Sequence, residues 1–208
     1  MTTPTVPRTD GRSARRAGTR EAIMDAATEL FAARGVTSTS IDDIAAAAGI
    51  AKGSIYYNFE SKAGLVEAIV ERSSTLLSQT LRQASAGHAG AELQVRIVRA
   101  LLLLVRDNSA AARLMVAELF RTERSWQEST RTWRALALEP LVDDLRSTGV
   151  GPEVAAIRAA SVVGATLVAG LDWLVFHPEL HYEDVVAAVL STLRGDGFGD
   201  GGGSTLLS

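Results

Sequence analysis

Polar residues with the chemistry to contact DNA gather in one short stretch of this chain, residues 52–62. Lysine ammonium groups, serine and tyrosine hydroxyls and asparagine amides all donate hydrogen bonds to phosphate oxygens or base edges. The side chains concerned are those of Lys52, Ser54, Tyr56, Tyr57, Asn58 and Lys62. Gly53, which has no side chain, would let its backbone approach a partner closely. The stretch therefore predicts nucleic-acid recognition rather than catalysis.

Two short helices are expected to position these groups. Ser40 is a good N-cap, and Asp43 three residues later provides a carboxylate variant of the capping box. Apolar residues then recur at helical spacing up to Ala48, which predicts a helix over about 41–48. Gly49 should end that helix, because glycine adopts positive φ easily.

A second helix is predicted over about 52–58, where Ile55 and Phe59 lie four residues apart and can pack against Ile44. A helix of about two turns is not stable alone in water, so packing must hold it. Two short helices with a tight turn between them, the second polar on its outer face, are typical of the helix-turn-helix of DNA-binding proteins.

The run from Ser40 to Leu65, SIDDIAAAAGIAKGSIYYNFESKAGL, resembles the DNA-binding domain of TetR-family transcriptional regulators. The matching positions are Ile44-Ala45, Ala48-Gly49-Ile50, Lys52-Gly53-Ser54-Ile55-Tyr56, Phe59, Ser61-Lys62 and Leu65. The sequence departs from the family pattern at Ala51, Asn58 and Ala63-Gly64. The resemblance implies a homodimer, usually a repressor, that binds a palindromic DNA operator and is released by a small-molecule effector.

Roles follow for the candidate DNA-binding residues. Because the start of a recognition helix meets base edges, we expect Lys52, Ser54 and Tyr57 to contact them. The resemblance implies phosphate contacts for Tyr56, Asn58 and Lys62, with core packing as the alternative for Tyr56 and a solvated surface lysine as the alternative for Lys62. Thr39 and Ser40 could meet phosphate through hydroxyl and backbone N–H groups.

The rest of the chain predicts an all-α fold of about nine helices: an N-terminal three-helix helix-turn-helix domain and a C-terminal helical bundle. No long stretch alternates with period 2, as a half-buried strand would. The other expected helices cover about 19–34, 62–83, 92–107, 109–120, 125–147, 153–176 and 182–194. Pro140 should kink or divide the helix over 125–147.

Four segments are expected along the chain. They are a disordered basic arm at 1–17, a DNA-binding domain at 18–65, a ligand-binding and dimerisation domain at 66–194, and a flexible Gly-rich tail at 195–208. Residues 1–20 hold five arginines and one aspartate, a charge of +4, while the whole chain carries −3. The arm could contact phosphate or the minor groove, or be a solvated tail.

By the resemblance, the second half encloses a cavity for an apolar or amphipathic effector and supplies the dimer interface. The expected pocket residues are Met115, Leu119, Phe120, Trp126, Trp133 and Leu167. The expected interface residues are Val163, Gly164, Leu167, Leu171, Val186, Val189 and Leu190. Burial in the core of a single chain is the alternative for both sets.

Several other classes are disfavoured. The chain has no cysteine, which excludes disulfides and fits a cytoplasmic protein, and its N-terminus lacks the apolar region of a secretory signal. The longest uncharged apolar run, 159–171, is too short to span a bilayer. The three histidines show no metal-ligand spacing and no catalytic motif is present, so we expect no enzyme, metal or cofactor. The remaining alternative is an adaptor protein of this fold that has lost specific DNA binding.

Overall fold

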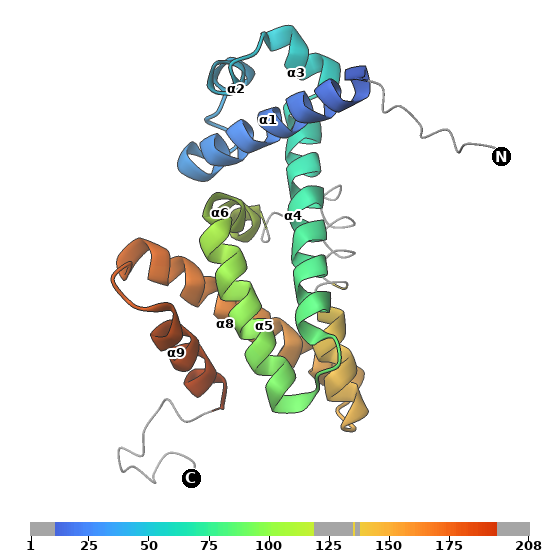
Figure 1. The fold of residues 1–208 in the computed structure, drawn as a ribbon, viewed down its shortest axis with the longest axis vertical. Coiled ribbons are helices and arrows are strands. Elements are labelled where there is room, and N and C mark those ends of the chain that lie inside the picture. Colours follow the sequence, from blue (N-terminus) through green and yellow to red (C-terminus); the bar gives the residue numbers. More distant parts are fainter. Residues whose placement is uncertain (1–10, 119–134, 136–137, 195–208) are drawn as a thin grey trace, which may run out of the picture. The chain divides into compact units, whose positions relative to one another are not determined.

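The protein is helical throughout the part of the chain that the structure, a computed structural model, describes: residues 11–118, 135 and 138–194 (Figure 1). Every regular element in these ranges is an α-helix, which confirms the predicted all-α fold. The chain divides into two compact units, the first ending at Val70 and the second beginning at Glu71.

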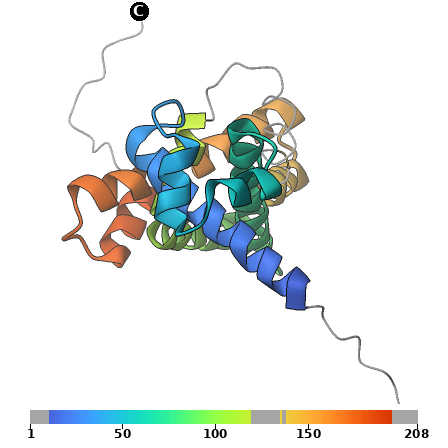
Figure 2. The same cartoon turned by 90° about the horizontal axis from the view of Figure 1, so that it is seen from above.

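The N-terminal unit contains α1 (Gly11–Arg34), α2 (Ile41–Ala48), α3 (Lys52–Asn58) and the first turns of α4 (Lys62–Ser85). Figures 1 and 2 show α1, α2 and α3 gathered into a three-helix arrangement, and α2 contacts both of the others. Apolar side chains from all four helices are fully buried, namely those of Ile23, Ile44, Ile55, Leu65 and Ile69.

Helix α1 begins earlier than the sequence suggested. Its first residue is Gly11, not Thr19, so the expectation of disorder is wrong for residues 11–17, while residues 1–10 lie outside the described residues. Alanine and arginine dominate this first part, and both have high helix propensity. The guanidinium groups of Arg16 and Arg20 also lie over the aromatic rings of Tyr57 and Phe59 at the end of α3.

The caps of the two short helices are those expected from the sequence. The Ser40 hydroxyl accepts a hydrogen bond from the Asp43 backbone N–H at 3.1 Å, and the Asp43 carboxylate accepts one from the Ser40 N–H at 2.9 Å. The Ser40 hydroxyl also donates to this carboxylate at 2.6 Å, and the bonds from the Ser40 hydroxyl and N–H lower the pKa of Asp43. Gly49 ends α2 with a φ of 67°. Ala51 makes no side-chain cap on α3, so the N-terminus of this helix is held by packing and tertiary contacts.

The C-terminal unit contains the rest of α4 and α5 (Gly90–Asp107), α6 (Ser109–Glu118), α8 (Pro152–Phe176) and α9 (Tyr182–Arg194). Residues 138–147 are also helical, with Pro140 among them. Most of the predicted helix at 125–147 lies outside the described residues, and the predicted kink or division at Pro140 is untested for that reason.

Helices α5 and α8 form the centre of this unit. They approach closely at Gly170, where an added Cβ would lie 3.1 Å from Cγ1 of Val105. One buried cluster joins α4, α5, residues 138–141 and α8 around Leu81, Ile97 and Leu101. A second cluster joins α5, α8 and α9 around Leu102 and Trp173.

Polar contacts fix α9 against α5. Arg99 donates two hydrogen bonds to the Glu183 carboxylate, at 2.7 and 2.6 Å, and the Tyr182 hydroxyl donates to the Arg99 carbonyl at 3.0 Å. The bond from Arg99 lowers the pKa of Glu183. Trp173 donates from Nε1 to the Leu180 carbonyl at 3.0 Å, which ties the turn between α8 and α9 to α8.

Three residues predicted for a dimer interface belong to the core of this single chain. Val163 is 6% exposed in the cluster around Ile97, while Val186 and Val189 are 2% and 6% exposed in the cluster around Trp173. This burial favours the intrachain-core alternative for the three residues, and the interface stays a prediction. Gly164, Leu167, Leu171 and Leu190 are only partly buried.

Helix α8 presents an apolar stripe to solvent, whereas the sequence suggested burial on several sides. Its exposed large residues recur at helical spacing: Val154, Ile157, Val168, Val175 and Phe176, each between 51% and 70% exposed. Contrary to expectation, α8 is long and apolar enough to cross a membrane by length and composition, with 28% of its apolar window buried. A helix that packs in a soluble core or between subunits has the same composition.

Candidate nucleic-acid interface

The outer face of α3 brings together five of the predicted DNA-binding residues. Tyr56 and Tyr57 are 52% and 70% exposed, although both are aromatic and could have been buried. Lys52 and Gly53 are also exposed, and Ser54 is partly exposed. The opposite face holds Ile55 and Phe59, which are buried. Packing therefore fixes the helix from one side and leaves its polar side open. The exposure of Tyr56 also disfavours the core-packing alternative.

Lys52 is paired with a residue that the sequence analysis had not placed in the site. Its Nζ donates to Oδ2 of Asp42, near the start of α2, at 2.9 Å. This hydrogen bond raises the pKa of Lys52. Charge spacing alone could not identify the pair, because it depends on how the turn brings two helix starts together.

Gly53 has no packing reason to be glycine. An added Cβ would meet nothing within 4 Å, and Gly53 is not among the residues with positive φ. Glycine in a helix also costs stability relative to alanine. A backbone left bare on the exposed face is useful only if something outside the described residues approaches it.

Lys62 has a structural role in this fold, and its phosphate contact stays a prediction. Its Nζ donates to the carbonyls of Val36 and Thr39 at 2.9 and 3.0 Å, and lies 3.5 Å from that of Thr37. An ammonium group has three hydrogens, and the loop between α1 and α2 uses them. The solvated-surface alternative is wrong, because the side chain is tied to this loop.

Three other predicted phosphate ligands are turned inward or already engaged. Thr39 is 1% exposed, and its hydroxyl donates to the Gly35 carbonyl at 3.0 Å. Ser40 uses both its hydroxyl and its N–H in the capping box. Asn58 donates its amide to the Ser54 carbonyl at 2.8 Å, and its Oδ1 is buried. These groups serve local structure, and the phosphate contacts of Thr39, Ser40 and Asn58 stay predictions.

Two arginines of α1 complete the edge of this face. Arg16 lies over the Tyr57 ring at 5.0 Å, and Arg20 lies over the Phe59 ring at 4.3 Å while donating to the Asn58 carbonyl at 3.0 Å. Arg20 thereby caps the C-terminus of α3. The sequence analysis placed Arg16 in a disordered arm over residues 1–17 and Arg20 in the helix that follows it. The helical spacing of Arg16 and Arg20, four residues apart, was the missed signal.

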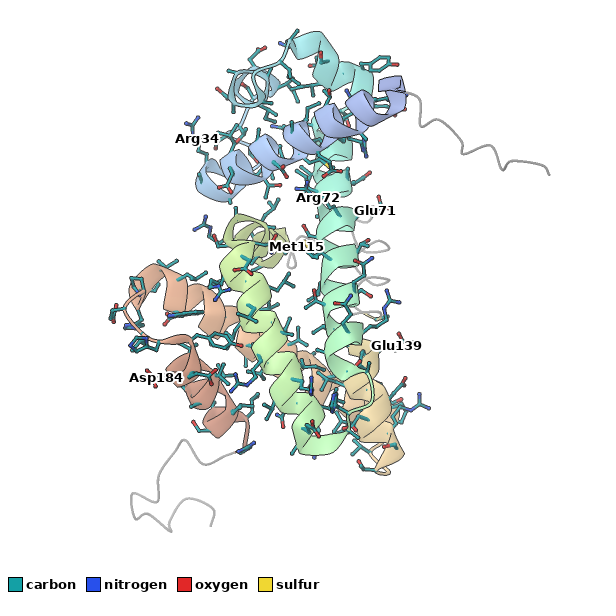
Figure 3. All side chains as sticks on the ribbon, in the orientation of Figure 1. Arg34, Glu71, Arg72, Met115, Glu139 and Asp184 are labelled. Carbon is teal, nitrogen blue, oxygen red and sulfur yellow. The ribbon has the colours of Figure 1, made fainter. Side chains whose placement is uncertain are left out.

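The predicted effector pocket is described only in small part. Met115 lies on α6 (Figure 3) and Leu167 on α8, both partly buried, whereas Leu119, Phe120, Trp126 and Trp133 lie outside the described residues. A groove of about 520 Å³ lies between α4 and α5 and shares no residue with that set. Its lining includes Ala84, Arg96, Ala100, Leu103 and Leu104.

Comparison with known proteins identifies the family. Residues 23–69 match the model of "Bacterial regulatory proteins, tetR family". The HTH-type transcriptional repressor KstR2 of Rhodococcus jostii (strain RHA1) is 44% identical over 70 residues, 34% of this chain and 32% of that protein. The HTH-type transcriptional regulator Mb3439c of Mycobacterium bovis is 31% identical over 163 residues, 65% of this chain and 87% of that protein. The chain belongs to the tetR family of bacterial regulatory proteins.

This tetR-family chain spans only about a third of the length of the first curated relatives it matches. The relatives are transcriptional regulators, in agreement with the expectation that the chain is not an enzyme. A solved structure of the regulator FadR from Bacillus subtilis, in complex with stearoyl-CoA, has the same fold. Its TM-score is 0.66 at 17% identity, over 83% of this chain and 96% of that chain.

Replacing Lys62 by methionine tests its structural role. We expect the N-terminal unit to lose about 1–3 kcal/mol of unfolding free energy, because partly buried loop carbonyls lose their donor. Lys52→Met is the matched control: it removes only an exposed ion pair and should change stability little. Denaturant unfolding followed by circular dichroism measures both. Unchanged stability in Lys62→Met, with a weaker salt dependence of DNA binding, would instead support the phosphate role.

Replacing Gly53 by alanine should separate stability from binding. The fold should gain up to about 1 kcal/mol, because alanine favours the helix and its Cβ has free space. DNA affinity should fall, since the same Cβ would stand between the backbone and the duplex. Thermal unfolding and a duplex titration measure the two effects. A variant that is more stable and binds equally well would show that Gly53 does not face the DNA.

Proposed function

We propose that this chain is a DNA-binding transcriptional regulator with α3 as its recognition helix. The observation that carries the proposal is the open face of α3, where Lys52, Gly53, Ser54, Tyr56 and Tyr57 lie together while its opposite face is buried. Residues 18–65 form the DNA-binding domain of this proposal, and residues 66–194 the effector-binding and dimerisation domain, in a cytoplasmic protein. Repression is the proposed mode, and it agrees with the name of the KstR2 relative.

The proposed regulator acts as a homodimer on a palindromic operator. One recognition helix reads one half-site, so a two-fold dimer reads two related half-sites. The apolar stripe of α8 supports this assembly, because contiguous exposed apolar patches commonly mark interaction sites. The α8 helices of two subunits would form the interface, together with Leu190 of α9. The partly buried residues that α8 contributes are Gly164, Leu167 and Leu171.

An apolar or amphipathic small molecule is the proposed effector that releases the protein from DNA. FadR of similar fold is in complex with stearoyl-CoA, an amphipathic molecule. The groove between α4 and α5 combines an apolar floor at Ala100 and Leu103 with Arg96 on its lining, and its volume is within the usual range of ligand sites. The effector must bind the DNA-free state more tightly than the DNA-bound state, since otherwise it shifts nothing.

Capture of genomic DNA tests the proposed function. The full chain is incubated with sheared DNA from its source, including sequence flanking its gene, and the retained fragments are sequenced. We expect enrichment of a palindrome whose affinity falls steeply with salt, by roughly 10³-fold between about 50 and 200 mM for about six phosphate contacts. Tyr57→Ala should weaken this binding with helical content unchanged. A folded dimer that enriches no sequence would favour the adaptor alternative.

The dimer has its own test. Val168→Asp places a charge in the middle of the α8 stripe, so the chain should become monomeric in sedimentation and its operator affinity should fall at least roughly tenfold, because the second half-site is lost. Leu76→Asp is the matched control, since Leu76 is also an exposed apolar residue but lies on α4, outside the groove. If both variants keep the oligomeric state of the parent chain, the α8 stripe is not the interface.

A further inference from the structure

The pair formed by Asp42 and Lys52 stands at the beginning of the recognition face. Lys52 is the first residue of α3, and Asp42 is the second residue of α2. Their side chains are 50% and 67% exposed although Nζ and Oδ2 are only 2.9 Å apart. An acid and a base are therefore held side by side at the surface that the proposed function turns toward DNA.

Local structure gives Asp42 little reason to be acidic. The capping box of α2 is made by Ser40 and Asp43, so Asp42 is not needed for it. An exposed ion pair contributes little to folding, since solvent screens it and ordering two long side chains costs entropy. A favourable interaction with the helix dipole is the remaining structural explanation. On a surface that approaches phosphates, however, a carboxylate is repelled unless it meets a hydrogen-bond donor.

Both side chains keep unused bonding capacity. Lys52 spends one of three ammonium hydrogens on Asp42, in contrast to Lys62, whose donors are directed at the carbonyls of one loop. Oδ1 of Asp42 makes no hydrogen bond within the described residues, because only Oδ2 receives the lysine. The pair thus offers two donor hydrogens beside a free acceptor.

We propose that Asp42 and Lys52 together read one G·C base pair in each half-site. In the major groove, guanine presents the acceptors N7 and O6, and cytosine presents its N4 amino donor next to O6. Lysine donors suit N7 and O6, and an aspartate acceptor suits N4. Adenine would place its N6 donor against the Lys52 ammonium, so the same arrangement disfavours an A·T pair. Asp42 is then a specificity-determining residue that the sequence resemblance did not assign.

This inference rests on the proposed function, and its test separates the two. The full-length protein, with Asp42→Asn and Lys52→Met variants, selects binders from a random duplex library. Duplexes that exchange single base pairs of the selected site are then titrated. The control is Asp184→Asn, which changes an aspartate in the first turn of α9, in the other unit of the chain (Figure 3). Circular dichroism verifies that each variant is folded.

We expect the parent chain and Asp184→Asn to prefer G·C at one position of the half-site. Asp42→Asn and Lys52→Met should lose that preference at the same position, with the ratio of affinities for the G·C and A·T duplexes falling roughly tenfold. Affinity changes that are uniform over all sequences would overturn the inference and leave Asp42 a simple helix-terminal charge. So would losses of preference at two different positions. If the parent chain selects no sequence at all, it is the proposed function that fails.

Discussion

A helix of seven residues does not hold itself together in water, and the rest of the N-terminal unit can be understood from that constraint. α3 is fixed by the burial of Ile55 and Phe59 against a core that α1, α2 and α4 supply. Two positively charged side chains also donate hydrogen bonds to backbone carbonyls around the helix. Arg20 donates to the Asn58 carbonyl at the end of α3, and Lys62 donates to the Val36 carbonyl in the loop before α2. The helix is thus held by its buried face and its ends, while the contacts on its outer face, Arg16 with Tyr57 and Lys52 with Asp42, are exposed.

This division of labour explains which polar residues remain available. Four of the predicted phosphate ligands have side chains that could bind phosphate, yet each makes a hydrogen bond to its own chain. They are Thr39, Ser40, Asn58 and Lys62. Tyr57 has no comparable structural use and remains exposed beside Arg16. The open face of α3 that carries the proposed function therefore consists of Lys52, Gly53, Ser54, Tyr56 and Tyr57.

Features that depend on neighbouring residues could be predicted from the sequence, whereas features that depend on distant residues could not. The bounds of α2 and α3 were predictable because their signals are local: a capping box at Ser40 and a left-handed glycine at Gly49. The partners of Lys62 were not, since they lie 23 to 26 residues away and depend on how the loop before α2 folds back. The same holds for Val163, whose apolar character fits an intrachain core and a subunit interface equally. Only packing decides between the two.

The position of α8 in the chain bears on how the protein is made. Synthesis proceeds from the N-terminus, and domains generally fold as units in that order. The N-terminal unit, with the proposed recognition helix, ends at Val70, so it is synthesised long before the apolar stripe of α8 (Pro152–Phe176). In the proposed dimer, the two subunits can pair only after α8 has been synthesised. Neighbouring ribosomes on one messenger RNA would favour this pairing, because they supply a second α8 at high local concentration.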